Sequence, residues 1–317
     1  MKILFFGTAE FAVPSVEALV ASGRHEILAV VTQPDKPSGR GQQVSASPVK
    51  RAALEMGLGV DQPKRVRGEA FLERARELRP DALALAAFGQ IIPQALLDLP
   101  PFGPINVHGS LLPAHRGAAP IQHAILNGEK ETGVTTMWMD ATLDTGDMLL
   151  KRVVPIEEDD TAGTLTPKMA EAGAELLIET LDLLAEGRCP RIPQDHALAT
   201  FAPPITPEDS LVRWEETAVR CRNRIRAMSP RPGAFAVFKG RRVKLWKAIT
   251  LPGERGEPGV VRAVTKEGVA VGTGQGVLLL TEVQPENSRR MSAADWARGA
   301  RIAPGDRFDP ANERPRI

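Results

Sequence analysis

The first 110 residues alternate short apolar runs with longer amphipathic stretches. Apolar runs of strand length occupy residues 3–6, 27–32, 82–87 and 105–108. The stretches between them have helical character at residues 11–19, 48–56 and 69–78. Strands that alternate with helices at this spacing predict a doubly wound parallel sheet of Rossmann-like type. In such sheets ligands bind beyond the carboxyl ends of the strands.

The pattern changes after residue 160. Residues 161–184 predict one long helix, and residues 188–207 follow with five prolines and little periodicity, which is typical of a linker. A further helix is predicted over residues 214–228. Five valine-rich runs separated by glycines then occupy residues 234–238, 241–249, 259–264, 268–271 and 277–283. They predict a small OB-like β-barrel, so we expect a catalytic domain at 1–187, a linker at 188–206 and a second domain at 207–317.

The composition agrees with a globular protein in a reducing compartment. The chain has 317 residues, about twice an ordinary domain, with 43% hydrophobic and 25% charged residues. Its two cysteines, Cys189 and Cys221, form no CxxC pair, which excludes a disulfide scaffold and disfavours a cysteine-rich zinc site. The apolar run at the N-terminus is too short for a signal peptide, and no later run reaches transmembrane length. We therefore expect a cytoplasmic protein that does not interact with membranes.

The net charge of +1 hides an asymmetry between the two halves of the chain. Residues 207–317 contain 21 Lys and Arg and 13 Asp and Glu, a balance of +8, whereas residues 1–206 contain 19 and 26, a balance of −7. A basic C-terminal part indicates a polyanionic partner, bound by neutralising phosphates and releasing counterions. A basic surface without a partner is the alternative.

Two polar segments carry the candidate chemistry. Asn106 and His108 share one face of a predicted strand, at the end where reactive groups are usually presented. Taken alone, this pair is more typical of a structural histidine that caps a strand. A loop containing Asp140, Asp144 and Asp147 follows between apolar strands, and it could be a surface turn, with Asp144 in an Asx turn, or a cation site.

Together, Asn106, His108, Asp144 and the SLLPxxRG run at residues 110–117 resemble the active site of the 10-formyltetrahydrofolate-dependent formyltransferases. The likeness covers nearly the whole chain. The segments GTAEFAVP, QPDKPSGRG and AMSPRPGA, at residues 7–14, 33–41 and 227–234, are similar to motifs of the members that formylate methionyl-tRNA. The resemblance implies a monomeric enzyme of translation initiation that takes its formyl group from 10-formyltetrahydrofolate, delivers it to initiator methionyl-tRNA and needs no metal.

These residue types can perform the transfer of a formyl carbon between two nitrogens. His108 can accept the proton of the attacking amine, because imidazole titrates near neutral pH. The Asn106 amide can donate to the oxyanion that develops, and Asp144, if hydrogen-bonded to the ring, would set its tautomer and stabilise the imidazolium. The resemblance places the folate along two segments. Its expected contacts are Phe88, Gly89, Ile91, Ser110, Leu111, Leu112 and Pro113.

Basic residues in three places are candidates for tRNA contacts. The resemblance implies that Lys36 and Arg40 belong to an inserted loop that meets the acceptor end. The basic strand contributes Arg241, Arg242 and Lys244, with Lys247 beyond them. Arginines also occupy alternate positions of the helix predicted over 214–228, so the helix spreads them around its surface; they are Arg220, Arg222, Arg224 and Arg226.

Two other functions are compatible with the same patterns. One is an enzyme of the same chemistry that formylates a small amine, which the +8 balance of residues 207–317 disfavours. The other is a non-catalytic RNA-binding protein that keeps the fold. The joint presence of Asn106, His108 and Asp144 disfavours that second reading.

Overall fold

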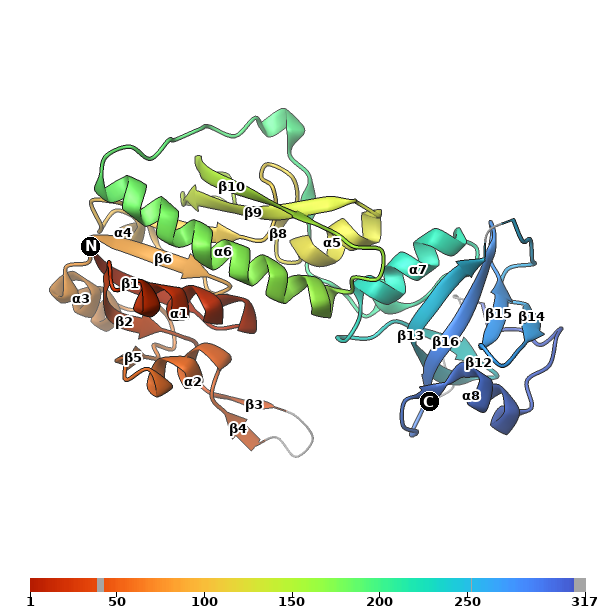
Figure 1. Ribbon diagram of the computed structural model, residues 1–317. Coiled ribbons are helices and arrows are strands. Elements are labelled where there is room, and N and C mark those ends of the chain that lie inside the picture. Colours follow the sequence, from red (N-terminus) through yellow and green to blue (C-terminus); the bar gives the residue numbers. More distant parts are fainter. Residues whose placement is uncertain (39–42, 252, 311–317) are drawn as a thin grey trace. The chain divides into compact units, whose positions relative to one another are not determined.

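The computed structural model describes residues 1–38, 43–251 and 253–310, and it divides into two compact units (Figure 1). The first unit contains Met1–Pro120, Glu131–Pro155 and Thr166–Pro203. The second contains Ile121–Lys130, Ile156–Leu165 and the residues from Pro204 onward. The chain therefore passes between the units several times before its C-terminal part begins.

A seven-stranded sheet forms the centre of the first unit, in the order β10-β9-β7-β6-β1-β2-β5. Its strands are β1 (Lys2–Gly7), β2 (Glu26–Val31), β5 (Val60–Asp61), β6 (Ala82–Ala86), β7 (Pro104–His108), β9 (Glu131–Trp138) and β10 (Met148–Pro155). The pairs from β7 to β5 are parallel, which confirms the predicted Rossmann-like sheet. Strands β9 and β10 add an antiparallel edge, because only a short loop joins them and such a loop can return the chain in the opposite direction.

Helices cover both faces of this sheet. Their bounds are α1 (Val13–Ser22), α2 (Pro48–Glu55), α3 (Glu69–Leu78), α4 (Gln94–Leu97) and α6 (Ala162–Ala185). Side chains alternate along β1, so Ile3 and Phe5 join the core under α1, α2 and α6, whereas Leu4 and Phe6 join the core under α3 and α4. A strand buried on both faces must be apolar throughout, which explains the continuous apolar run at the N-terminus.

Smaller elements complete the first unit. They are β3 (Lys36–Ser38), β4 (Gln43–Ser45), β8 (Arg116–Gly117), β11 (Phe201–Ala202), and the 3-10 helices Glu10–Ala12 and His196–Leu198. Strand β11 pairs with β8, and Ile192 forms a bridge to Met148 of β10. Backbone pairing thus attaches residues 192–202, inside the segment whose composition is typical of a linker, to the first unit.

The second unit is built on a six-stranded antiparallel sheet, ordered β12-β13-β16-β15-β14 with β17 beside β16. Its strands are β12 (Phe235–Phe238), β13 (Arg241–Leu251), β14 (Val261–Val264), β15 (Val269–Gly272), β16 (Val277–Pro285) and β17 (Met291–Ser292). Its helices are α5 (Pro120–Asn127), α7 (Ala218–Ala227), α8 (Ala293–Ala300) and the 3-10 turn Glu208–Ser210.

The last described residues link the two edges of this second sheet. The backbone N–H of Phe308 donates to Gly259 beside β14, and that of Asp309 donates to Val237 of β12. The rings of Trp214, Phe238, Trp296 and Phe308 pack around this junction. The sheet is therefore curled into the barrel-like form that the glycine-separated valine runs predict. Within residues 1–38, 43–251 and 253–310, no helix is long and apolar enough to cross a membrane.

Candidate active site

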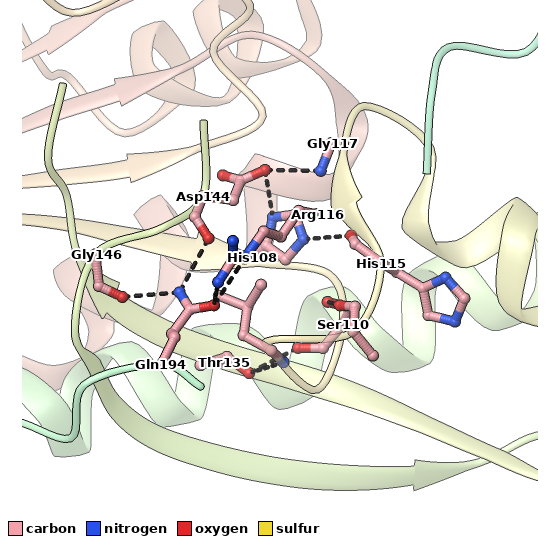
Figure 2. A network of polar contacts seen from close by, with 11 residues as sticks. His108, Ser110, His115, Arg116, Gly117, Thr135, Asp144, Gly146 and Gln194 are labelled. Atoms are coloured by element: carbon pink, nitrogen blue, oxygen red, sulfur yellow. Dashed lines mark hydrogen bonds and ion pairs between the residues drawn. The ribbon is translucent and has the colours of Figure 1, made fainter. Parts of the chain in front are cut away.

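His108 ends β7 at the carboxyl edge of the first sheet, where parallel sheets usually bind their ligands. Its ring is buried, and Nε2 lies 3.0 Å from the carbonyl oxygen of His115. A carbonyl can only accept a hydrogen bond, so Nε2 carries the proton and the lone pair of the neutral ring is on Nδ1. The carbonyl of His115 thus sets the tautomer of His108 (Figure 2).

Asp144 faces the other ring nitrogen. Its Oδ2 lies 3.7 Å from Nδ1 of His108, which is too long for a hydrogen bond but short enough for ion pairing once the ring is protonated. The same oxygen accepts a hydrogen bond of 2.8 Å from the backbone N–H of Gly117. The hydrogen bond through which Asp144 was expected to set the tautomer is therefore not formed. The charge of Asp144 would still stabilise the imidazolium.

The backbone around Asp144 has a restricted conformation. Asp144 has a φ of 53°, in the left-handed region that aspartate tolerates better than most residues. A Cβ on Gly146 would lie only 1.8 Å from the carbonyl oxygen of Trp138, so this position admits only glycine. These two local constraints account for the aspartate at position 144 and the glycine at position 146.

Asn106 precedes His108 on the same strand by one pleat and is half-buried. Among the described residues its side-chain amide has no hydrogen-bond partner. Strands β6 and β9 flank it on either side, through Leu85 and Met137. A side-chain amide that the protein leaves unpaired beside the ring of a histidine is available to a substrate oxygen.

Gln194, which the sequence did not single out, and Arg116 of the SLLPxxRG run support the Asp144 loop. The side-chain Nε2 of Gln194 donates to the backbone oxygens of Asp144 and Gly146, at 2.9 and 2.8 Å. Its Oε1 accepts from Nε and Nη2 of Arg116, at 3.0 and 2.7 Å, and Arg116 also contacts His196. Both Gln194 and Arg116 are buried. Figure 2 shows this chain of contacts running from Arg116 through Gln194 to the loop.

Ser110 and Thr135 hold the segment that follows His108. The hydroxyl of Ser110 donates to the carbonyl of Ala114, and the hydroxyl of Thr135 donates to the carbonyl of Ser110 at 2.7 Å. The oxygen of Thr135 also accepts from the N–H of Leu112. These bonds fix the backbone between His108 and the carbonyl of His115.

The residues expected along the folate differ in what they expose. The side chains of Phe88, Ser110 and Leu112 are buried, and the ring of Phe88 packs edge-on against Phe6. These three side chains thus contact the protein interior, and a ligand could meet only the backbone groups of these residues. Ile91 is the opposite case, with 89% of its surface exposed at the end of β6. Gly89 has a φ of 79°, and Leu111 and Pro113 are half-buried.

Comparison with known proteins places this geometry in a family. Residues 1–181 match the family model described as formyl transferase, and residues 204–301 match the one described as formyl transferase, C-terminal domain. The methionyl-tRNA formyltransferase of Pelotomaculum thermopropionicum is 47% identical over 307 residues, covering 96% of this chain and 97% of that protein. The chain belongs to the methionyl-tRNA formyltransferases. The protein of that name from Moorella thermoacetica is 48% identical, with coverages of 96% and 98%.

Solved structures of formyltransferases share the fold. A methionyl-tRNA formyltransferase from Clostridium thermocellum matches 80% of this chain and 95% of its own, with a TM-score of 0.56 and 17% identity. An N-formyltransferase from Helicobacter canadensis matches 92% and 100%, with a TM-score of 0.66 and 20% identity. HypX from Aquifex aeolicus, solved with tetrahydrofolic acid, matches 94% of this chain with a TM-score of 0.63 and 21% identity, and the chain spans about half (47%) of HypX.

In a methionyl-tRNA formyltransferase the basic residues of the second unit are of particular interest. Arg241 and Arg242 are exposed at the start of β13 and line a groove of about 610 Å³ whose other wall includes Trp296 of α8. Arg242 stacks over the ring of Phe235 at 4.1 Å, and Lys244 donates to the carbonyl of Pro232. The sequence predicted the basic strand, but not the helix that completes the groove.

The four arginines of α7 are not equivalent. Arg222 pairs with Glu158 and Asp159, and Arg224 makes two bonds of 2.8 Å to Glu216. Arg226 donates to backbone oxygens of residues 157 and 160. Only Arg220 is exposed. The helix therefore uses three of these charges to hold its own unit together.

The loop expected to meet the acceptor end is described in part. Lys36 is exposed in β3, and its Nζ donates to Oε1 of Gln33 at 2.6 Å. Arg40 lies outside the described residues.

Proposed function

We propose that this formyltransferase moves a formyl group from 10-formyltetrahydrofolate to the α-amino group of methionine on initiator tRNA, for translation initiation. The observation that carries the proposal is the arrangement of His108 between the carbonyl of His115 and the carboxylate of Asp144. The names of the most similar relatives support the acceptor, and the folate bound to HypX supports the donor class.

His108 acts as the general base in this proposal. Its Nδ1 lone pair accepts a proton from the amine as the new C–N bond forms, and the ring returns that proton to the folate nitrogen that leaves as the old C–N bond breaks. The resulting imidazolium lies between a carbonyl at 3.0 Å and a carboxylate at 3.7 Å, so both neighbours favour its charge. General-base catalysis of this kind contributes roughly 10²–10⁴-fold to a rate.

Asn106 stabilises the negative charge that develops on the formyl oxygen. Its unpaired amide donates to the formyl oxygen as that oxygen becomes an oxyanion. A single donor of this type contributes about 3–4 kcal/mol to transition-state stabilisation in a well-studied hydrolase. Asp144 completes the site through its charge, and the N–H of Gly117 holds its carboxylate in place.

The described residues fit a folate at the carboxyl edge of the sheet. When bound, 10-formyltetrahydrofolate supplies a formyl group already activated on nitrogen. Ile91 offers an exposed apolar surface to an aromatic ring, and the residues from Ser110 to Pro113 follow β7, the strand beside β6. Backbone groups of Phe88 and Gly89 are suited to read a polar ring edge.

The domains divide the work in the same proposal. Residues 1–187 carry out catalysis, residues 188–206 join the domains, and residues 207–317 bind tRNA through exposed Arg241 and Arg242, which line their groove together with Glu286 and Asp295. The enzyme acts as a cytoplasmic monomer. Lys36, Arg40 and Lys244 add contacts to the acceptor.

A formylation assay with two acceptors tests the function. Initiator methionyl-tRNA should be formylated efficiently with 10-formyltetrahydrofolate, and elongator methionyl-tRNA poorly. An enzyme for a small amine would show neither this preference nor a steep dependence of acceptor binding on salt, because only a polyanion releases many counterions. Formylation of free amines without formylation of tRNA would reject the proposal.

A further inference from the structure

The loop between β9 and β10, residues 139–147, carries three aspartates that the structure uses in different ways. Asp144 faces the reacting histidine. Asp140 accepts hydrogen bonds from two threonine hydroxyls of the same loop, at 2.9 and 2.8 Å, and so shapes the loop from within. Asp147, at the end of the loop, has no part in the catalytic proposal. Its carboxylate is bound from another segment of the chain.

Arg191 is the residue that binds Asp147. Its Nε donates to Oδ2 of Asp147 at 3.0 Å, and its Nη2 lies 3.0 Å from the same oxygen. The guanidinium also lies over the ring of Trp138, with Cζ 4.1 Å from the ring centroid. Trp138 is at the other end of the loop, where its backbone N–H donates to the carbonyl of Asp147 at 2.8 Å. Arg191 therefore holds both ends of the loop, one by charge and the other by stacking.

The ring of Trp138 is a fixed platform for this stacking. It lies against Gly103, which has a φ of 85°, and a Cβ at that position would be only 2.3 Å from the ring. The backbone of Trp138 also pairs with Ile105 of β7. Because only a planar cation can stack on this ring and pair with Asp147 at the same time, lysine could not replace Arg191 in full.

Residues 191–194, here called the strap, run beside the loop and the start of β10. The backbone of the strap exchanges two hydrogen bonds of 2.9 Å with Met148, the first residue of β10. Gln194 donates to two carbonyls of the loop, one of them that of Asp144 (Figure 2). The strap thus holds the end of the loop through Arg191 and its middle through Gln194.

We propose that Arg191 is a positioning residue for formyl transfer. Through its contacts at the two ends of the loop, it keeps the Asp144 carboxylate beside His108. The inference rests on the proposed function, in which the charge of Asp144 stabilises the imidazolium. The side chain of Arg191 is 48% exposed and that of Asp147 is 31% exposed, so their ion pair adds little to global stability. Its effect should therefore appear in turnover.

Steady-state formylation by the full chain, with methionyl-tRNA and 10-formyltetrahydrofolate, tests the assignment. In Arg191→Gln we expect kcat to fall about tenfold, because a small displacement of a group beside the reacting atoms is costly, while KM for methionyl-tRNA stays within about twofold. Arg191→Lys keeps the charge but cannot stack and pair together, so it should recover only part of the loss. The urea midpoints of both variants should stay close to that of the unmodified protein.

A second background separates positioning from a general structural role. In Asp144→Asn, the addition of Arg191→Gln should lower kcat by less than about twofold, because no charge is left to position. The matched control is Arg188→Gln. It removes the same charge from an exposed arginine three residues earlier, which pairs with Glu186 instead, and it should leave kcat unchanged.

Two kinetic results would overturn the inference: a kcat of Arg191→Gln equal to that of the unmodified protein, or a loss of the same size in the Asp144→Asn background. A raised KM for methionyl-tRNA with unchanged kcat would overturn it as well, and would make Arg191 an RNA contact. If Asp144→Asn alone leaves kcat unchanged, the proposed role of Asp144 fails first, and the inference fails with it.

Discussion

The contact between Gln194 and the Asp144 loop offers a sharp test of how the active site is held. Substituting Gln194 by methionine keeps the length of the side chain and removes its four hydrogen bonds, two to backbone oxygens and two from Arg116. Substituting it by glutamate instead keeps an acceptor for Arg116. Glutamate, however, turns an oxygen toward the carbonyls of Asp144 and Gly146.

The structure gives different magnitudes for the two variants. In Gln194→Met, buried Arg116 loses its main partner and, among the residues that the structure describes, keeps only the contact with His196. Removing one partner of a buried charge costs about 3–5 kcal/mol, a large part of the roughly 5–15 kcal/mol that stabilises a protein. In Gln194→Glu the charge of Arg116 stays paired. The loss is then about 1 kcal/mol for each of the two bonds to the loop.

Turnover and stability should therefore separate in Gln194→Glu. We expect the free energy of unfolding measured in urea to fall by about 2 kcal/mol, the sum of those two bonds. We expect kcat to fall roughly 10- to 100-fold, because displacement of Asp144 removes its charge from beside His108. KM for methionyl-tRNA should stay the same. Ile192→Ser is the control, since it alters an exposed side chain of the same segment and leaves the loop untouched. Unchanged kcat in Gln194→Glu would refute the idea that Gln194 positions Asp144.

Four further outcomes follow from other residues. His108→Ala should lower kcat by roughly 10²–10⁴ in single-turnover formylation while tRNA binding is retained; near-normal turnover would remove His108 from the mechanism. Arg224→Ala should destabilise the protein by up to about 3 kcal/mol in urea unfolding, because it leaves half-buried Glu216 uncompensated, whereas exposed Arg220→Ala should change stability by less than about 0.5 kcal/mol. Burial, with the N-terminal ammonium nearby, lowers the pKa of His25 in the folded protein from its ordinary 6.5. The unfolded chain therefore protonates His25 more readily, and the free energy of unfolding should fall as pH drops through 6.5. His25→Gln should lose this part of the pH dependence when urea midpoints are compared at several pH values. Arg40→Lys should reduce formylation of initiator tRNA more than that of a version with its first base pair closed, because lysine cannot make bidentate contacts; an unchanged ratio of the two would exclude a role in reading the acceptor end.

The regular elements could be predicted because the spacing of apolar residues along each helix or strand reflects which of its faces are buried. Helix α3 has the bounds that the amphipathic stretch at residues 69–78 predicts, and each of the five valine-rich runs overlaps a strand of the second sheet. A continuous apolar run predicted β1 because that strand is covered on both faces. Where buried positions repeat at regular intervals, the local sequence is enough to predict the helix or strand.

The contacts that complete the site could not be predicted in this way. Gln194 lies in a stretch with several prolines and without periodicity, so nothing near it in sequence indicates that its amide meets residues about 50 positions earlier. The alternate spacing of the α7 arginines likewise cannot say which face is buried. Both depend on long-range packing, and single-residue polar contacts leave no repeating pattern.

The tautomer of His108 shows why this missing information matters for mechanism. The sequence led us to expect that Asp144, if hydrogen-bonded to the ring, would set its tautomer. In the structure the carbonyl of His115 performs that task, and its position depends on the bonds that Thr135 and Ser110 make behind it. Asp144 is then left to act through charge alone, at a distance fixed by Gly117 and by the amide of Gln194. A carboxylate beside the proton-accepting nitrogen of a base stabilises that base most strongly when the base becomes charged. Gln194, which holds the Asp144 loop from a segment of linker-like composition, should therefore affect the transition state rather than substrate binding.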